Sequence, residues 1–243
     1  MEEPGGSERG RAGKPARRHV VAAAVRLFDG AGYEATTMDG IAAASGVSRR
    51  SLFRHFGSKE DILFAEHDEL FETVTRYLEA TPGDDPAATV CAAARMVFQA
   101  YVDVPEITVP RYRLVRAVPR LRDREIAMTA RYQGAFSRYL ARGETTGPRV
   151  LAGEALAASV IAAHNHVLRS WLHDPDQPVP WARFDRAMEF VTRSLGAMLR
   201  SSGQTAAAGE SPRDTVLVAV YPSSTGGTDV LRRVSEALGE GPG

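Results

Sequence analysis

Cysteine is nearly absent from this sequence, and long apolar runs are absent altogether. Cys91 is the only cysteine among 243 residues, which excludes an intramolecular disulfide framework and a metal site built from several thiolates. No segment approaches the roughly 20 consecutive apolar residues that a membrane-spanning helix needs. The first residues, 1–6, lack the apolar core of a signal peptide. We therefore expect a cytoplasmic protein in which Cys91 is a small buried apolar residue.

Motifs of common enzyme classes are absent as well. The sequence contains no G-x-S-x-G, no glycine-rich phosphate loop and no H-E-x-x-H. His164 and His166 are two positions apart, so they cannot share one helix face and are not expected to bind a metal together. A solvated helix face explains the charged run at 66–69. We expect no enzyme, no catalytic residues, no metal and no cofactor.

The net charge is zero, because 30 basic residues balance 30 acidic ones. The balance is uneven along the chain: between Arg9 and Lys59 there are ten basic and three acidic side chains. A basic end on an otherwise acidic chain indicates that this end binds a polyanion. A basic tail that serves only solubility would have the same composition.

Apolar residues recur at helical spacing along most of the chain, with Gly and Pro between the periodic segments. We expect helices at about 15–30, 37–44, 48–56, 59–80, 86–103, 120–142, 148–173 and 180–200. Pro105, Pro110 and Pro119 are expected to break the stretch before residue 120 and to leave one short helix there. This pattern predicts an all-α protein.

The C-terminal tail has a different pattern. Residues 201–214 have the composition of a flexible linker, Thr215–Tyr221 is typical of a strand, and Asp229–Leu238 is typical of a short amphipathic helix. A lone strand is not stable by itself, so the tail is disordered, docked on the helical body or paired with its copy in a partner subunit. The apolar side of Asp229–Leu238 favours a docked or paired tail.

The segments 37–44 and 48–56 form a helix-turn-helix, with a turn at Gly46. Glycine permits a backbone angle there that a side chain would resist. The expected core of the first three helices consists of Val21, Phe28, Ile41, Ala42, Val47, Leu52 and Phe56. With these residues facing inward, the third helix keeps an outward face made of Ser48, Arg49, Arg50, Ser51 and Arg54.

This outward face suits the major groove of DNA. Arg49 and Arg50 can each form a bidentate pair with guanine, worth about 1–3 kcal/mol of discrimination. Arg54, His55 and Lys59 follow and are expected to contact phosphates, which positions the protein without specifying a sequence. The N-terminus of the fourth helix offers further amide donors to a phosphate. A scaffold whose arginines are merely solvated is the alternative.

The stretch from Gly32 to Leu63 resembles the DNA-binding signature of the TetR family of transcriptional regulators. The matching positions are Gly32, Tyr33, Thr36, Thr37, Ile41, Ala42, Gly46, Val47, Ser48, Leu52, Phe56, Lys59 and Leu63. Two positions depart from the family. Phe53 stands where a tyrosine usually contacts DNA, which removes one phosphate or sugar contact. Gly40 stands where a charged helix former is usual, which weakens the second helix slightly.

The resemblance implies a two-part all-α fold: an N-terminal three-helix helix-turn-helix domain, then a helical ligand-binding and dimerisation domain of about six helices, with an extra C-terminal tail. We expect a disordered basic arm at 1–13, the DNA-binding domain at 14–60, the ligand-binding and dimerisation domain at 61–200, and a linker and tail at 201–243. The expected DNA-contacting residues are Thr37, Ser48, Arg49, Arg50, Ser51, Phe53, Arg54, His55 and Lys59.

By the same resemblance, the fourth to seventh helices enclose a ligand pocket. The candidates for its lining are Phe71, Phe98, Tyr101, Met128, Tyr132, Phe136 and His164. Plain core packing would give the same spacing of aromatic and methionine side chains. The arginine-rich run at 113–124 is similar to regulators that bind acyl thioesters, and it equally fits a solvated helix face. We expect a mostly apolar ligand with one polar or charged end.

The resemblance also implies a homodimer formed through the last two long helices. Small residues on the eighth helix allow close approach: Ala155, Ala157, Ala158, Ser159, Ala162 and Ala163. Larger apolar surface is expected from Trp171, Phe184, Met188, Val191 and Leu195. Intrachain core is the alternative for all of these residues. A dimer presents two recognition helices about one DNA turn apart, so we expect double-stranded DNA with a near-palindromic operator as partner.

We therefore expect a DNA-binding transcriptional regulator, a repressor that a small-molecule ligand releases from its operator. One alternative is a regulator that has lost its ligand or that activates. Another is a helical small-molecule-binding or interaction protein whose helix-turn-helix no longer engages DNA. The basic outward face of the third helix favours DNA binding over the last alternative.

Overall fold

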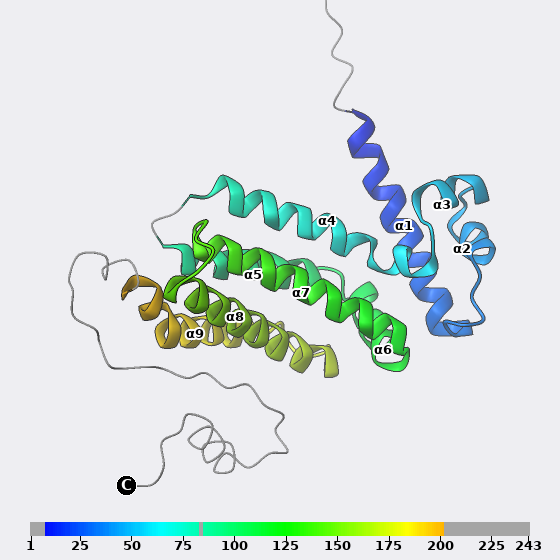
Figure 1. Ribbon diagram of the computed structural model, residues 1–243. Helices are drawn as coiled ribbons and strands as arrows, with labels where there is room; N and C mark the ends of the chain where they lie inside the picture. The colour runs from blue at the N-terminus through cyan, green and yellow to red at the C-terminus, as the bar shows by residue number, and fades with distance from the viewer. Residues whose placement is uncertain (1–7, 83–84, 202–243) are drawn as a thin grey trace, which may run out of the picture. The chain divides into compact units, whose positions relative to one another are not determined.

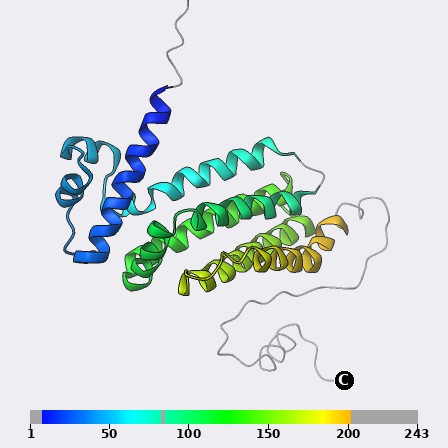
Figure 2. The same cartoon turned by 180° about the vertical axis from the view of Figure 1, so that it is seen from behind.

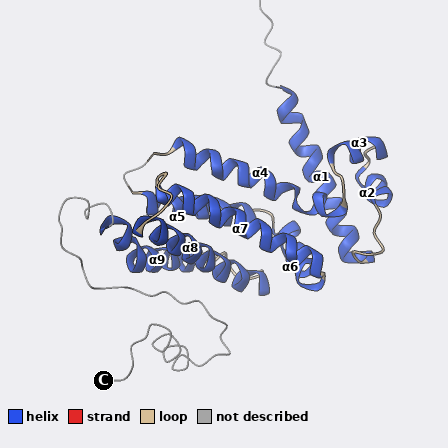
Figure 3. Ribbon diagram, viewed as in Figure 1, coloured by secondary structure: helices blue, strands red, loops and turns tan. Residues whose placement is uncertain are grey.

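The computed structural model describes residues 8–82 and 85–201, which belong to one compact unit. These residues form helices and no strand (Figures 1 and 3). The helices are α1 (Glu8–Ala31), α2 (Met38–Ser45), α3 (Arg49–His55), α4 (Lys59–Ala80), α5 (Pro86–Val102), α6 (Pro105–Ala117), α7 (Pro119–Ala141), α8 (Pro148–His173) and α9 (Trp181–Ser201). The predicted all-α fold is confirmed for this part of the chain. The predicted strand Thr215–Tyr221 and helix Asp229–Leu238 lie outside the described residues.

The first helix begins earlier than the sequence predicts. It starts at Glu8 and not near Pro15, so residues 8–13, which were expected in a disordered arm, are helical. Extending an existing helix by one residue costs far less than nucleating it. The weakly patterned N-terminal segment therefore continues the helix that the amphipathic part of α1 nucleates.

The predicted break at Pro110 is wrong. Helix α6 runs through Pro110 from Pro105 to Ala117. A proline inside a helix removes the hydrogen bond to the carbonyl four residues earlier. That carbonyl belongs to Glu106, an exposed residue of the first turn, where water can solvate it. The helix therefore continues, while Pro105 and Pro119 occupy the first turns of α6 and α7, where proline fits.

Helices α1 to α3 and the start of α4 share one apolar core, and we call this part the reading head. Six of the seven predicted core residues are at most 4% exposed: Val21, Phe28, Ile41, Ala42, Leu52 and Phe56. Val47 is half-buried and packs against them. The same core contains Ile107 and Val115 of α6 and Leu121 of α7. The reading head is therefore packed together with part of the domain that follows it.

Helices α4 to α9 form the helical domain, which has a second core. Phe98, Phe136 and Leu156 are among its fully buried members. Helix α8 packs against α7 and α9, and α8 and α9 lie side by side on the far side of the domain from α4 (Figures 1 and 2). Gly153 permits the close approach of α8 to α7, because a Cβ there would lie 3.2 Å from the Cβ of Leu140. None of the described helices combines the length and apolar character needed to cross a bilayer.

The larger apolar residues predicted for the dimer surface lie inside this second core. Trp171, Phe184, Met188, Val191 and Leu195 are all buried within the chain. The prediction that they supply intersubunit surface is therefore wrong, because they lie on the inner faces of α8 and α9. The outer faces carry Leu151 and Phe190 instead, which are 65% and 72% exposed.

Candidate nucleic-acid interface and ligand cavity

Capping residues fix both ends of α2. Oγ1 of Thr37 accepts a hydrogen bond from the N–H of Gly40 at 3.1 Å. Gly46 ends the helix with a φ of 66° and a ψ of 17°, a left-handed conformation that side chains disfavour. The N–H of Gly46 donates to the carbonyl oxygen of Ala43 at 3.3 Å. These caps fix where α2 ends and therefore the direction in which α3 begins.

Helix α3 follows this turn directly. The hydroxyl oxygen of Ser48 accepts a hydrogen bond from the N–H of Ser51 at 3.1 Å. Leu52 points into the reading-head core, which turns the opposite side of α3 to solvent. The exposed residues are Ser48, Arg49, Arg50, Phe53, Arg54 and His55, while Ser51 is half-buried. The predicted outward face is therefore accessible, and its contacts with DNA stay a prediction.

Arg49 already has partners within the reading head. Its Nε lies 2.9 Å from Oδ1 of Asp39 in the first turn of α2, and its guanidinium lies 5.5 Å from the centroid of the Phe53 ring. Both charged side chains are largely exposed, so the ion pair contributes little to stability. It directs Arg49 across the turn, with Phe53 as a platform. Arg50, by contrast, has no ion-pair or hydrogen-bond partner among the described residues.

Lys59 is engaged inside the reading head. Its Nζ donates to the carbonyl oxygen of Tyr33 at 2.7 Å and lies 4.5 Å from the centroid of that ring. The first turn of α4 also carries Glu60 and Asp61, and Asp61 pairs with Arg124 at 2.8 Å. These carboxylates already stabilise the positive end of the helix dipole and would repel a phosphate. The predicted phosphate contact at this helix end therefore gains no support.

A second candidate site lies inside the helical domain. Five of the seven predicted lining residues border one small hollow: Tyr101, Met128, Tyr132, Phe136 and His164. The other two lie behind them. Phe98 is buried against Phe184, with ring centroids 4.7 Å apart, and Phe71 packs edge-on against Tyr132 at 5.1 Å. The structure thus brings most of the predicted set together, and ligand binding by it stays a prediction.

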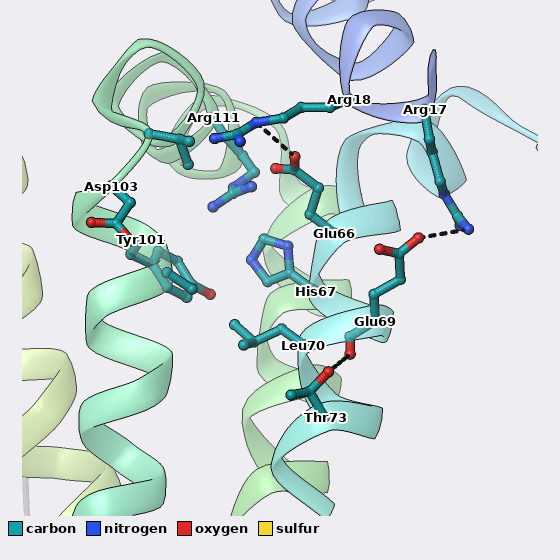
Figure 4. Close-up of a pocket in the computed structure, with 12 residues that line it drawn as sticks. Arg17, Arg18, Glu66, His67, Glu69, Leu70, Thr73, Tyr101, Asp103 and Arg111 are labelled. Carbon is teal, nitrogen blue, oxygen red and sulfur yellow. Dashed lines mark hydrogen bonds and ion pairs between the residues drawn. The ribbon is translucent and has the colours of Figure 1, made fainter. Parts of the chain in front are cut away.

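Two larger hollows adjoin the small one, and we call the three together the central cavity. One, of about 580 Å³, lies between α1, α4, α5 and α6 (Figure 4). The other, of about 470 Å³, is lined mainly by α6, α7 and α8. His67 and Tyr101 border all three hollows. His67 was not predicted as a lining residue because it lies in a charged run, although its spacing from Leu63 and Leu70 places it on the apolar face of α4.

Several buried polar atoms of the central cavity lack partners. Nδ1 of His67, Oη of Tyr132 and Nε2 of His164 have no hydrogen-bond partner among the described residues. Burial lowers the pKa of His67 well below its usual range and lowers that of His164 to about 4, so both imidazoles are neutral at neutral pH. Buried polar groups without partners are rare and costly. Their gathering around one cavity indicates a place for a ligand with polar groups.

Two ion pairs lie beside the larger hollow. Nη1 of Arg17 lies 2.9 Å from Oε1 of Glu69, and Nε of Arg18 lies 3.7 Å from Oε1 of Glu66 (Figure 4). Each pair joins α1 of the reading head to α4 of the helical domain. All four residues border the hollow, so the cavity reaches the contact between these two helices.

The DNA-binding segment matches a known family. Residues 20–65 match the model of the bacterial regulatory proteins of the tetR family. This segment is therefore a TetR-family DNA-binding segment. Over 200 residues it is 26% identical to the HTH-type transcriptional regulator TcmR of Streptomyces glaucescens, an alignment that covers 77% of this chain and 87% of TcmR. The chain is a DNA-binding transcriptional regulator, which confirms the function predicted from its N-terminal segment.

Solved structures share the fold at low sequence identity. The complex of SmeT with triclosan has a TM-score of 0.53 and 18% identity, and covers 74% of this chain and 91% of SmeT. SmeT is described as the repressor of the Stenotrophomonas maltophilia multidrug efflux pump SmeDEF. FadR of Bacillus subtilis, solved with stearoyl-CoA, has a TM-score of 0.53 and 16% identity, and covers 72% of this chain and 96% of FadR. Identities this low make the likeness one of fold.

Proposed function

We propose that this regulator is a homodimeric repressor, which a small amphipathic molecule in the central cavity releases from a near-palindromic operator. Two relatives of the same fold support the proposal by their descriptions. SmeT is a repressor that was solved with triclosan, and FadR was solved with stearoyl-CoA. Both bound molecules have an apolar part, which matches the mostly apolar lining of the small hollow here.

The contacts of α6 are the main support for the proposal, because this helix contacts both the cavity and the reading head. Thr108 and Arg111 border the cavity, whereas Ile107 packs in the reading-head core. Val115 takes part in both. Close-packed interiors transmit displacement, so a ligand that moves α6 also moves residues packed against the reading head. Such a ligand favours a conformation whose two recognition helices have the wrong spacing for the operator.

In the proposed complex, α3 lies in the major groove of DNA. Arg50 is free to pair with guanine, and Arg49 exchanges Asp39 for a base. Phosphate contacts come from Arg54 and His55, and from the hydroxyls of Thr37, Ser48 and Ser51. The hydroxyls of Thr37 and Ser48 accept backbone N–H groups and keep their own protons available to phosphate oxygens. Lys59 contributes by holding α4 against Tyr33.

The dimer forms through the outer faces of α8 and α9. Leu151, Ala155, Ala158 and Ala162 recur at the spacing of one helix face. All four are exposed or half-buried in the single chain, and small residues let a second helix approach closely. Phe190 adds a large exposed ring on α9. Exposed apolar surface of this kind is typical of protein–protein contacts.

The proposal is tested by selecting bound fragments from the DNA of the source genome without bias. We expect a near-palindromic site whose half-sites lie about 34–36 Å apart, or a multiple of this distance. A panel of small molecules is then screened for release of the selected DNA. A single half-site, or a monomer by light scattering at micromolar concentration, would contradict the dimeric complex. Operator binding that no molecule of the panel weakens would contradict the ligand-released repressor.

A further inference from the structure

A buried arginine lies in the wall between the two larger hollows. Arg111 of α6 borders both of them and is only 5% exposed. Its guanidinium lies 5.2 Å from the centroid of the Tyr101 ring. In Figure 4, Arg111, His67 and Tyr101 converge from three different helices. Arg111 is thus placed where a molecule that fills either hollow would meet it.

No carboxylate of the described residues lies within ion-pair distance, 4 Å, of this guanidinium. Glu66 and Glu125 are near enough to interact with Arg111 electrostatically. Glu66, however, pairs with Arg18, and the strongest attraction that Glu125 experiences is to Arg169. A buried cation without a close counter-ion is strongly disfavoured. In other proteins a carboxylate side chain neutralises such a group. Here a bound anion would be the counter-ion of Arg111.

The hollow between α6, α7 and α8 is basic as well. Its lining contains Arg111, Arg116, Arg122 and Arg169 against one acidic residue, Glu125. Exposed rims of one charge attract molecules of the opposite charge. The hollow therefore favours an anion, and its guanidinium groups can bind oxyanions through paired hydrogen bonds.

An apolar compartment adjoins this basic side. The small hollow is lined by Phe64, Val97, Met128, Phe136 and Ile161, together with the unpartnered Oη of Tyr132 and Nε2 of His164. Tyr101 borders this compartment and also lies under the Arg111 guanidinium. The compartment has a volume of only about 40 Å³. With a charged end at Arg111, it can therefore take only the end of an apolar body, the rest of which would lie in the adjoining larger hollow.

We propose that Arg111 binds the oxyanion of an amphipathic organic acid whose apolar part enters the compartment beside Tyr101. The inference rests on the proposed function only in taking the central cavity as the ligand site. It names the ligand class as organic anions with one carboxylate or phosphate end. Neutral molecules of the same shape bind more weakly because they leave the guanidinium without a counter-ion.

The test uses the full chain and the neutral fluorescent probe N-phenyl-1-naphthylamine as reporter of the cavity. Decanoate, decyl phosphate and decan-1-ol, which share one alkyl chain, compete for the probe. In the unsubstituted protein we expect an acid to displace the probe at a concentration roughly tenfold lower than the alcohol, as a charge-assisted hydrogen bond allows. The better of the two acids identifies a carboxylate or a phosphate end.

In the variant Arg111→Gln this preference should be lost, so that acid and alcohol displace the probe at similar concentrations. Arg113→Gln is the matched control, because Arg113 lies on the same helix and is exposed. Arg111→Lys keeps the charge and should retain part of the preference, even if Arg111→Gln fails to fold.

Equal competition by acid and alcohol in the unsubstituted protein would overturn the role of Arg111 and leave the cavity as a ligand site. The same conclusion follows if the preference survives in Arg111→Gln or disappears in Arg113→Gln. Failure of the probe and of all three competitors to bind would instead remove the cavity as a ligand site, and with it the ligand-released repressor.

Discussion

The outward face of α3 and the central cavity both present polar groups without partners, but in opposite surroundings. Arg50 on α3 is exposed to water and has no ion-pair or hydrogen-bond partner among the described residues. His67, Tyr132 and His164 in the cavity have buried atoms without hydrogen-bond partners. An exposed group exchanges water for a partner at little cost, whereas a buried unpaired group costs about 1–3 kcal/mol.

The comparison separates two kinds of binding site in one chain. The face of α3 does not depend on a ligand for its stability, so its residues can be replaced with little effect on folding. The buried unpaired groups of the cavity make folding less favourable. Substitutions there therefore change the free energy of unfolding and the ligand affinity together.

The largest effect is expected at the face of α3. Replacing Arg49 and Arg50 together by alanine removes two candidate base contacts, each worth about 1–3 kcal/mol, so affinity for the selected operator should fall by roughly 100-fold or more. Thermal stability should stay nearly unchanged, because both side chains are exposed. Fluorescence anisotropy with labelled operator, alongside thermal melting, measures both. Arg113→Ala, an exposed arginine on α6, is the control; unchanged operator binding by the double variant would show that α3 does not read DNA.

The second effect concerns dimerisation, which involves neither the outward face of α3 nor the central cavity. Phe190→Glu places a charge in the proposed dimer surface, where burying the ring is worth about 1.5–3 kcal/mol. The dimer dissociation constant should rise at least tenfold, as measured by analytical ultracentrifugation. Ile126→Glu replaces another large exposed apolar residue, on α7, and should have no effect. Equal weakening by the two substitutions would argue against the α8–α9 surface.

A pH dependence is expected from the cavity and not from α3. The folded-state pKa of His164 is about 4, below its unfolded value of about 6.5, so the unfolded chain binds the extra proton between these values. Stability is therefore lost as the pH falls through this window, by up to about 1.4 kcal/mol per pH unit. His164→Gln should flatten the slope of unfolding free energy against pH, measured with urea.

The exposed His166 on the same helix provides the control for this slope. His166→Gln should leave it as in the unsubstituted protein, while His67, also buried with a lowered pKa, keeps part of the slope in His164→Gln. Indistinguishable slopes in all three proteins would mean that His164 is accessible to protons in the folded chain.

The smallest effect tests the unpaired phenol directly. Tyr132→Phe removes a hydroxyl without a partner, so the free energy of unfolding should stay the same or rise by up to about 1 kcal/mol. Tyr139→Phe on the same helix removes a hydroxyl that donates to the carbonyl oxygen of Thr81 and should lower it by about 1 kcal/mol. Chemical denaturation compares the two. A similar loss from both would mean that the Tyr132 hydroxyl is bonded in solution.

Sequence patterns predict the reading head almost completely. Thr37, Gly46 and Ser48 are local signals whose caps form within three or four residues, and Leu52 sets the inward phase of α3. The start of α1 and the continuity of α6 through Pro110 were missed, because each depends on helix propagation and not on a local signal.

The cavity was predicted only in part, since it depends on packing between distant segments. Helical spacing places Tyr101, Tyr132 and His164 on inward faces, and the structure brings them together. Arg111 gave no such signal, because it lies in an arginine-rich run that suits a solvated face. Only its burial beside α4 and α5 distinguishes it from Arg113, its exposed neighbour on α6.

The central claim is that a ligand in the central cavity moves α6 and thereby lowers the affinity of α3 for DNA. The dissociation constant for the selected operator, measured with and without a saturating competitor from the N-phenyl-1-naphthylamine assay, tests it most directly. The account predicts a rise of about 5–150-fold, the range typical of allosteric coupling. The same dissociation constant at full occupancy of the cavity would contradict it.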